Sequence, residues 1–227
     1  MIDHARRLAE HLTQALTSGH TPLVIGGDCS LLIGTGLALS RRGGSGLVHI
    51  DGHTDFRHPG NSDQCASVAG EDLAAAIGLH WPAIADIDEA GPYFDPASAV
   101  HIGCREDDAD MAEVRSRIGL VLPAREAVGR GMREAAEAAR AVAGGSGYWI
   151  QLDVDVLDPT MMPAVDSPTP GGLSPDQLVA LLQALAPSAI GASVTVFDPD
   201  LDPDGSSARL LTEVLSTGLE HLGSRAG

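Results

Sequence analysis

Short runs of β-branched and other apolar residues alternate along the chain with longer segments in which apolar residues recur every three or four positions. The apolar runs predict strands at residues 22–26, 46–51, 99–103, 118–122, 147–154 and about 190–197. The periodic segments predict helices at 2–17, 30–41, 71–78, 107–117, 125–142, 174–186 and 206–221. Because the strand runs lack polar alternation, both faces of their sheet are expected to be covered. The pattern therefore predicts an α/β fold with a parallel sheet wrapped by helices.

Length, charge and cysteine content limit the number of domains, the kinds of partner and the cellular compartment to be expected. The 227 residues favour one domain, over residues 1–227, and the formal net charge of −17 argues against nucleic acid or an anionic membrane as a partner. No apolar run approaches the length of a membrane span, and the amphipathic N-terminus lacks the apolar core of a secretory signal. Three widely spaced cysteines fit a reducing compartment better than a disulfide framework. We therefore expect a soluble, globular cytoplasmic protein.

Acidic residues follow two of the predicted strands. Asp51, His53 and Asp55 follow the second strand at a spacing of two, and Asp153 and Asp155 close the fifth strand at the same spacing. In extended backbone this spacing sends side chains to one side. Carboxylates this close need a cation to remain ionised, and an oxygen-rich site with one imidazole suits Mn²⁺ or a similar divalent ion. Either motif alone is equally compatible with helix caps or turns, whereas the two together predict a metal site.

The longer irregular stretches at 52–70 and 155–173 are candidate functional loops. Five segments in and around them resemble the successive signatures of the arginase/agmatinase/formiminoglutamase family, the ureohydrolases: "VIGGDCS", "DGHTDF", "HIGCRE", "QLDVDVLDP" and "SPTPGGLS". The resemblance implies a three-layer α/β/α sandwich with a mainly parallel sheet, in a homo-oligomer. It also implies two Mn²⁺ ions and hydrolysis of a C–N bond in a linear amidine or guanidino compound by a metal-bound hydroxide.

Carried over by position, the resemblance assigns metal-ligand roles to Cys29, Asp51, His53, Asp55, Asp153 and Asp155. Asp51 and Asp153 would bridge the two ions, with Cys29 beside the ion held by Asp55 and His53 beside the other. Asp55 would also act catalytically, by accepting a hydrogen bond from the hydroxide. Substrate-binding roles are expected for Asn61, Asp108 and Asp198.

Several positions depart from the family pattern. Cys29 stands where the family usually has histidine, and a thiolate shifts metal preference toward Zn²⁺ or Fe²⁺. Cys29 is a substituted ligand, an inert neighbour of a single-metal site, or a nucleophile at a strand–turn–helix elbow, and we favour the ligand. Ala69 replaces a histidine that helps to protonate the leaving group, and Val196 replaces a glutamate that grips the cationic substrate. The family's first strand is also expected to be missing.

These features together predict a metal-dependent hydrolase of a guanidino or amidine compound, with arginine itself disfavoured by Val196. The first alternative is a catalytically impaired protein of the same fold that binds a metal or a ligand. The second is a metal-independent hydrolase that uses Cys29 as its nucleophile.

Overall fold

The computed structural model describes residues 1–225. Its sheet consists of parallel strands in the order β1-β6-β5-β2-β3-β4. Their bounds are β1 Leu23–Ile25, β2 Gly46–Ile50, β3 Ala99–Ile102, β4 Leu120–Leu122, β5 Tyr148–Asp153 and β6 Ala189–Thr195. The six predicted strands and their parallel arrangement are therefore confirmed.

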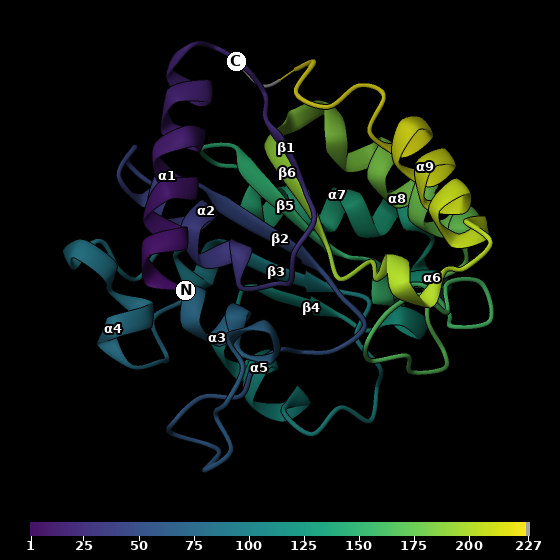
Figure 1. The fold of residues 1–227 in the computed structure, drawn as a ribbon, viewed down its shortest axis with the longest axis horizontal. Coiled ribbons are helices and arrows are strands. Elements are labelled where there is room, and N and C mark those ends of the chain that lie inside the picture. Colours follow the sequence, from purple (N-terminus) through teal and green to yellow (C-terminus); the bar gives the residue numbers. More distant parts are fainter. Residues whose placement is uncertain (226–227) are drawn as a thin grey trace.

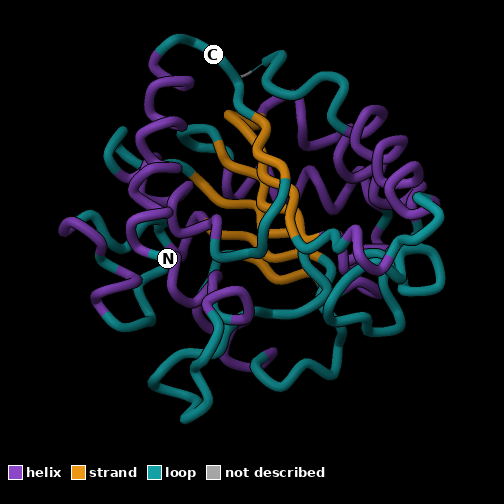
Figure 2. The backbone as a smooth tube through the Cα atoms, viewed as in Figure 1, coloured by secondary structure: helices purple, strands orange, loops and turns teal. Residues whose placement is uncertain are grey.

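Helices cover both faces of the sheet, which lies between them in Figures 1 and 2. One apolar core joins the sheet to helices from the N-terminal half of the chain, and a second core joins the opposite face to helices from the C-terminal half. The first set comprises α1 Ile2–Thr17, α2 Leu31–Ser40, α3 Asp72–Ala76, α4 Pro82–Ala85 and α5 Met111–Arg117; the second comprises α6 Ala124–Arg130, α7 Met132–Ala143, α8 Pro175–Leu185 and α9 Ser206–Gly218. The three-layer α/β/α architecture is confirmed.

Two helical predictions need correction. The helix expected at 125–142 is divided into α6 and α7 by Gly131, whose φ of 92° lies outside the helical range and suits glycine. The short helix α4 was not predicted. Its four residues make about one turn, which is too short for apolar residues to recur at the helical spacing. Over the described residues, no helix is both long and apolar enough to cross a membrane.

The strand order reverses at the centre of the sheet. β2 is paired with β3 on one side and with β5 on the other, so the chain winds outward from the β2–β5 pair in both directions. Loops that leave the carboxyl ends of such neighbouring strands open a crevice, which is the usual ligand site of open α/β sheets. The two segments with the acidic motifs are the ones that leave β2 and β5.

Candidate metal centre

The first acidic segment lies in a turn that follows β2. The strand ends at Ile50, and the Asp51 carboxylate accepts a hydrogen bond from the backbone N–H of His53 at 2.7 Å. Asp55 has a φ of 46°, in the left-handed region. The expectation that extended backbone alone directs these side chains is therefore wrong, since a tight turn aims them.

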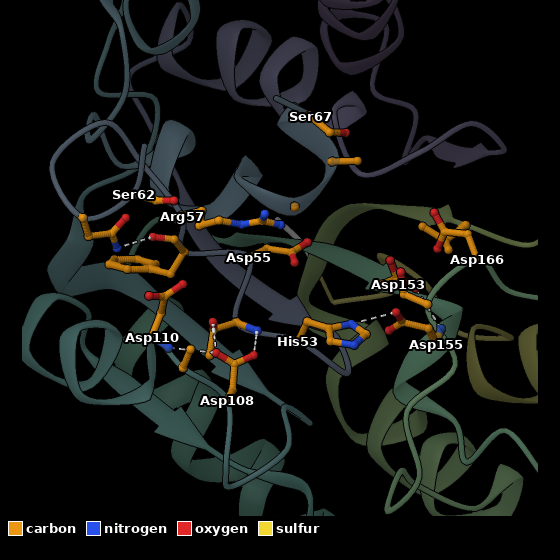
Figure 3. Close-up of a pocket in the computed structure, with 18 residues that line it drawn as sticks. His53, Asp55, Arg57, Ser62, Ser67, Asp108, Asp110, Asp153, Asp155 and Asp166 are labelled. Carbon is orange, nitrogen blue, oxygen red and sulfur yellow. Dashed lines mark hydrogen bonds and ion pairs between the residues drawn. The ribbon is translucent and has the colours of Figure 1, made fainter. Parts of the chain in front are cut away.

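The second acidic segment closes against the first. The Asp153 carboxylate accepts a hydrogen bond from the backbone N–H of Asp155 at 2.7 Å, which fixes the turn after β5. The Asp155 carboxylate in turn accepts a hydrogen bond from the backbone N–H of Gly52 at 3.0 Å, and its other oxygen lies 2.9 Å from Nδ1 of His53 (Figure 3). Residues about a hundred positions apart are thereby brought into one cluster.

Burial and mutual repulsion perturb the ionisation of this cluster. Burial is the main cause that raises the pKa of Asp51 well above its ordinary value, and the charges of Asp55 and Asp155 raise it further. The pKa of Asp153 is raised well above its ordinary value by burial and then by Asp51. The pKa of His53 is raised, mainly by its hydrogen bond to Asp155.

A divalent cation fits this donor set. Ligand atoms of Asp51, His53 and Asp155 lie within 4.8 Å of one another, and the Asp51 Oδ2 atom, although buried, has no hydrogen-bond partner among the described residues. Buried carboxylates are stable as anions only when they are paired or coordinate a metal. The arrangement is an oxygen-rich site with one imidazole, the ligand chemistry of Mn²⁺ and similar ions.

Cys29 lies beside the cluster, at the start of α2. The turn that carries it follows β1 and contains Gly26 and Gly27, with φ angles of 105° and 73°. Its thiol is fully buried, donates a hydrogen bond to Asp153 at 3.0 Å and lies 3.0 Å from the Thr195 hydroxyl. Burial, followed by the charge of Asp153, raises the pKa of this thiol well above its ordinary value. Without a bound cation Cys29 is therefore a neutral thiol, which is a poor nucleophile.

A cavity of about 640 Å³ opens above the cluster. It is lined mainly by the two predicted loops, and Figure 3 draws its side chains. Carboxylates of Asp55, Asp108, Asp110, Asp153, Asp155 and Asp166 line it together with the guanidinium of Arg57. The lining is strongly acidic, and among the described residues Arg57 is its one permanently positive side chain, so the cavity suits a ligand with a positively charged group.

The three predicted substrate-binding residues differ in position. Asn61 lines the cavity, but its amide donates to the Phe56 carbonyl and to Glu113. Asp108 also lines it and accepts hydrogen bonds from the Thr54 hydroxyl and backbone N–H at 2.6 and 3.0 Å. Asp198 is not part of the cavity lining, since its carboxylate caps the short helix Pro199–Leu201 by accepting from the backbone N–H of Asp200. The prediction for Asp198 therefore lacks a structural basis.

Ala69 and Val196, the two positions that depart from the family pattern, both line the cavity. Val196 is β-branched yet has a φ of 75°, a conformation rare for such residues. Its backbone N–H donates to the Gly27 carbonyl at 2.9 Å, which ties the end of β6 to the turn that precedes Cys29. This region thus supplies an apolar wall to the cavity.

Arg105 holds the loop after β5 in place. Arg105 is 5% exposed, and its guanidinium donates to the backbone carbonyls of Gly103, Asp155, Thr169 and Pro170. The Thr169 hydroxyl lies 3.1 Å from Nε2 of His53. Arg105 thereby fixes the backbone on both sides of the imidazole.

Other residues at the site were not singled out from the sequence. Arg57 and Asp166 lie on the two loops, where an isolated charged residue gives no distinguishing signal. His49 and Asp72 are fully buried, and their ligand atoms lie within 4.8 Å of those of Asp55. A polar residue at an otherwise apolar position, as in the run "GLVHID", was the available signal for His49.

Fold and site together define a class: parallel α/β proteins with a cluster of acidic residues and histidine at the switch point of the sheet, a donor set that could hold a metal ion. A model of the Arginase family matches residues 2–219. The chain belongs to the arginase family, and the resemblance read from its motifs is confirmed.

Individual relatives agree with this assignment. The chain is 29% identical over 223 residues to the arginase of Brevibacillus brevis, covering 96% of this chain and 74% of that protein. It is 32% identical over 219 residues to the guanidinopropionase of Pseudomonas aeruginosa, covering 92% of this chain and 63% of that protein. Among solved structures, the arginase of Bacillus cereus superposes with a TM-score of 0.88 at 26% identity, covering 96% of this chain and 77% of the other.

Proposed function

We propose that the protein is a metal-dependent hydrolase that cleaves a C–N bond of a linear guanidino or amidino compound. The observation that carries this proposal is the convergence of Asp51, His53, Asp153 and Asp155 at the switch point, beneath an acidic cavity. Membership of a family that includes an arginase, a guanidinopropionase and a formimidoylglutamase supports the same chemistry.

In this proposal Asp51, His53, Asp153 and Asp155 hold one divalent cation, and Asp55 contributes to a second. Mn²⁺ is the proposed ion for both, because the donors are mostly carboxylate oxygens. Bound ions of this kind would supply Lewis acidity and an activated water as the nucleophile. For Cys29 a ligand role beside Asp55 would require loss of the thiol proton that now hydrogen-bonds to Asp153.

The side chains of the chain perform the remaining steps. Asp55 faces the cavity next to the cluster and is the group placed to accept a proton from the attacking water and return it to the departing amine. In the metal-free protein its pKa is raised well above the ordinary value, by burial and then by Asp72, and a bound divalent cation would lower it again. His53 is held by Asp155 and Thr169, so its ring does not rotate during the reaction.

The cavity lining supports a cationic substrate with an anionic end. Asp108, Asp110 and Asp166 offer carboxylates to a guanidinium or amidinium group, a role that the apolar Val196 does not fill. Arg57, which lies beside Asp55 and Asp110 in the lining, offers a guanidinium to a carboxylate of the substrate. We therefore propose a guanidino or amidino carboxylic acid as substrate.

We further propose a cytoplasmic homo-oligomer. Cys29, Cys65 and Cys104 are all unpaired, which supports a reducing compartment. Strand β1 is an edge strand whose Leu23 and Ile25 are 42% and 67% exposed, and a second subunit would cover such an apolar edge.

Metal analysis combined with turnover tests this proposal. The purified protein is expected to bind Mn²⁺ and to release urea, ammonia or a free amine from a panel of guanidino and amidino compounds, with activity abolished by EDTA and restored by Mn²⁺. Asp155→Asn is expected to lose at least a hundredfold in kcat/KM, whereas Asp176→Asn, the same change at an exposed position in the first turn of α8, is expected to be unaffected.

The alternatives give different results in the same experiment. Binding of Mn²⁺ without turnover of any compound would favour the catalytically impaired protein, to which the departures at Cys29, Ala69 and Val196 point. Activity that resists EDTA but disappears in Cys29→Ser would favour the thiol route.

A further inference from the structure

A second group of potential ligands lies beneath Asp55, on the side away from the cavity. Ligand atoms of His49, Asp55 and Asp72 lie within 4.8 Å of one another. His49 projects from β2 and Asp72 is the first residue of α3, and both side chains are 0% exposed. This group is distinct from the ligand set that the motif resemblance assigns, which contains neither His49 nor Asp72.

The buried polar atoms of this group lack partners. Within residues 1–225, both carboxylate oxygens of Asp72, the Nε2 atom of His49 and the Oδ2 atom of Asp51 accept or donate no hydrogen bond. The His49 Nε2 atom lies 3.4 Å from Asp72 and 3.8 Å from Asp51. Leaving one buried polar group unsatisfied costs about 1–3 kcal/mol, so a cluster of four such atoms needs a common partner.

Hydrogen bonding across the sheet orients His49 as a metal ligand. Its Nδ1 atom lies 2.9 Å from Nδ1 of His101, the residue beside it on β3. When Nδ1–H of His49 donates to His101, the Nε2 atom of His49 carries a lone pair and faces the two carboxylates. Histidines that bind metals through one nitrogen commonly donate the other N–H to such a partner.

Unlike Nε2 of His49 and the carboxylate of Asp72, Cys29 already has hydrogen-bond partners within the described residues. Its thiol donates to Asp153 and also contacts Thr195, so its hydrogen-bonding capacity is used within the protein. A cation beside Cys29 would have to displace both contacts, whereas a cation beside Asp72 would bind a carboxylate whose contact with Nε2 of His49, at 3.4 Å, is longer than a normal charge-assisted hydrogen bond. Ligand atoms of Cys29, Asp51 and Asp55 also lie within 4.8 Å of one another, so the two positions share Asp55.

We propose that the second divalent cation of the centre is held by His49, Asp55 and Asp72, and not by Cys29. This inference rests on the proposed function in one respect, that the protein binds divalent metal at the neighbouring cluster. Asp72 and His49 thereby replace the ligand that the histidine-to-cysteine difference at position 29 removes.

Metal stoichiometry tests the proposal without relying on turnover. The wild-type protein and Cys29→Ser are each expected to bind about two equivalents of Mn²⁺, and Asp72→Asn about one. Asp176→Asn, the same change at an exposed position in the first turn of α8, is the control. It is expected to retain both ions. His101→Phe is expected to weaken binding of the second ion about 10–100-fold.

The Co²⁺-loaded wild-type protein provides a readout that needs no variant. Its absorption spectrum is expected to lack the intense near-ultraviolet charge-transfer band of a thiolate–Co²⁺ bond. Such a band, a loss of one equivalent in Cys29→Ser, or two equivalents retained in Asp72→Asn would overturn the inference. A wild-type protein with one equivalent, unchanged in Asp72→Asn, would overturn it while leaving the first site intact. Absence of all metal binding would overturn the proposed function as well.

Discussion

Removal of divalent cations leaves the carboxyl groups of Asp51, Asp72 and Asp153 buried beside one another, at 1%, 0% and 4% exposure. Burial raises the pKa of each of them, well above the ordinary value for Asp51 and Asp153. A carboxyl with a raised pKa in the folded state keeps its proton at a pH where the unfolded chain has lost it. The metal-free protein is therefore expected to lose stability as the pH rises from the ordinary value of 3.8 through the folded-state pKa values.

The magnitude follows from proton linkage. One proton retained in the folded state and lost on unfolding reduces the free energy of unfolding by about 1.4 kcal/mol per pH unit. Between pH 5 and pH 7 one such proton removes about 3 kcal/mol, a large part of the 5–15 kcal/mol that typically stabilises a domain. His53 acts in the same direction, because its raised pKa contributes stability at low pH that is lost as the pH rises past its folded-state value. Bound metal offsets this loss, since each ion at a hundredfold excess over its Kd adds about 2.7 kcal/mol.

Chemical denaturation at pH 5, 6 and 7, with EDTA or with Mn²⁺, measures this effect. In EDTA the free energy of unfolding is expected to fall with pH, and in Mn²⁺ the fall is expected to disappear. Asp51→Asn is expected to flatten the EDTA profile, and Asp176→Asn, at an exposed site, to leave it unchanged. A free energy of unfolding in EDTA that stays constant or rises from pH 5 to pH 7 would refute the reasoning.

Three further changes probe the loops around the cavity. Arg57→Gln is expected to raise KM about tenfold for a guanidino carboxylic acid but not for a guanidino compound with an uncharged end, and equal effects in steady-state kinetics would exclude a carboxylate contact. Arg105→Met leaves the carbonyls of Thr169 and Pro170 without their donor and is expected to cost about 3 kcal/mol in urea denaturation. Asp158→Asn is expected to cost about 1–2 kcal/mol at pH 7. Hydrogen bonding by Thr160 lowers the pKa of Asp158 to about 2, so this cost should shrink between pH 3.8 and pH 2 in the same assay.

The sheet was predictable from the sequence because both of its faces are buried. Strands such as Gly46–Ile50 and Tyr148–Asp153 consist of apolar residues with few polar interruptions, which gives a strong local signal. The acidic residues after these strands were predictable for a related reason, since the carboxyl ends of neighbouring parallel strands share one edge. The position of Asp51 and Asp153 at the carboxyl edge of the sheet could therefore be predicted from the sequence alone.

The remaining site residues depend on tertiary contacts that have no local signal. Asp72 begins a helix, where an aspartate is common for reasons of capping and charge alone. Only the packing of α3 against the turn after β2 brings it to Asp55. Asp198 illustrates the converse, because its position in the chain suggested a substrate contact and its side chain instead caps a turn.

Charge balance links Asp72 to the substrate. With two divalent cations bound, four ionised carboxylates would leave the centre neutral, whereas the five contributed by Asp51, Asp55, Asp72, Asp153 and Asp155 leave one negative charge. Replacing a neutral histidine with the neutral Cys29 thiol does not change this count, but adding Asp72 does. A net negative centre in a water-poor crevice attracts a guanidinium or amidinium group more strongly than a neutral one, because the field there is poorly screened. The same carboxylate that completes a cation site would therefore supply part of the attraction that a glutamate at position 196 would have provided.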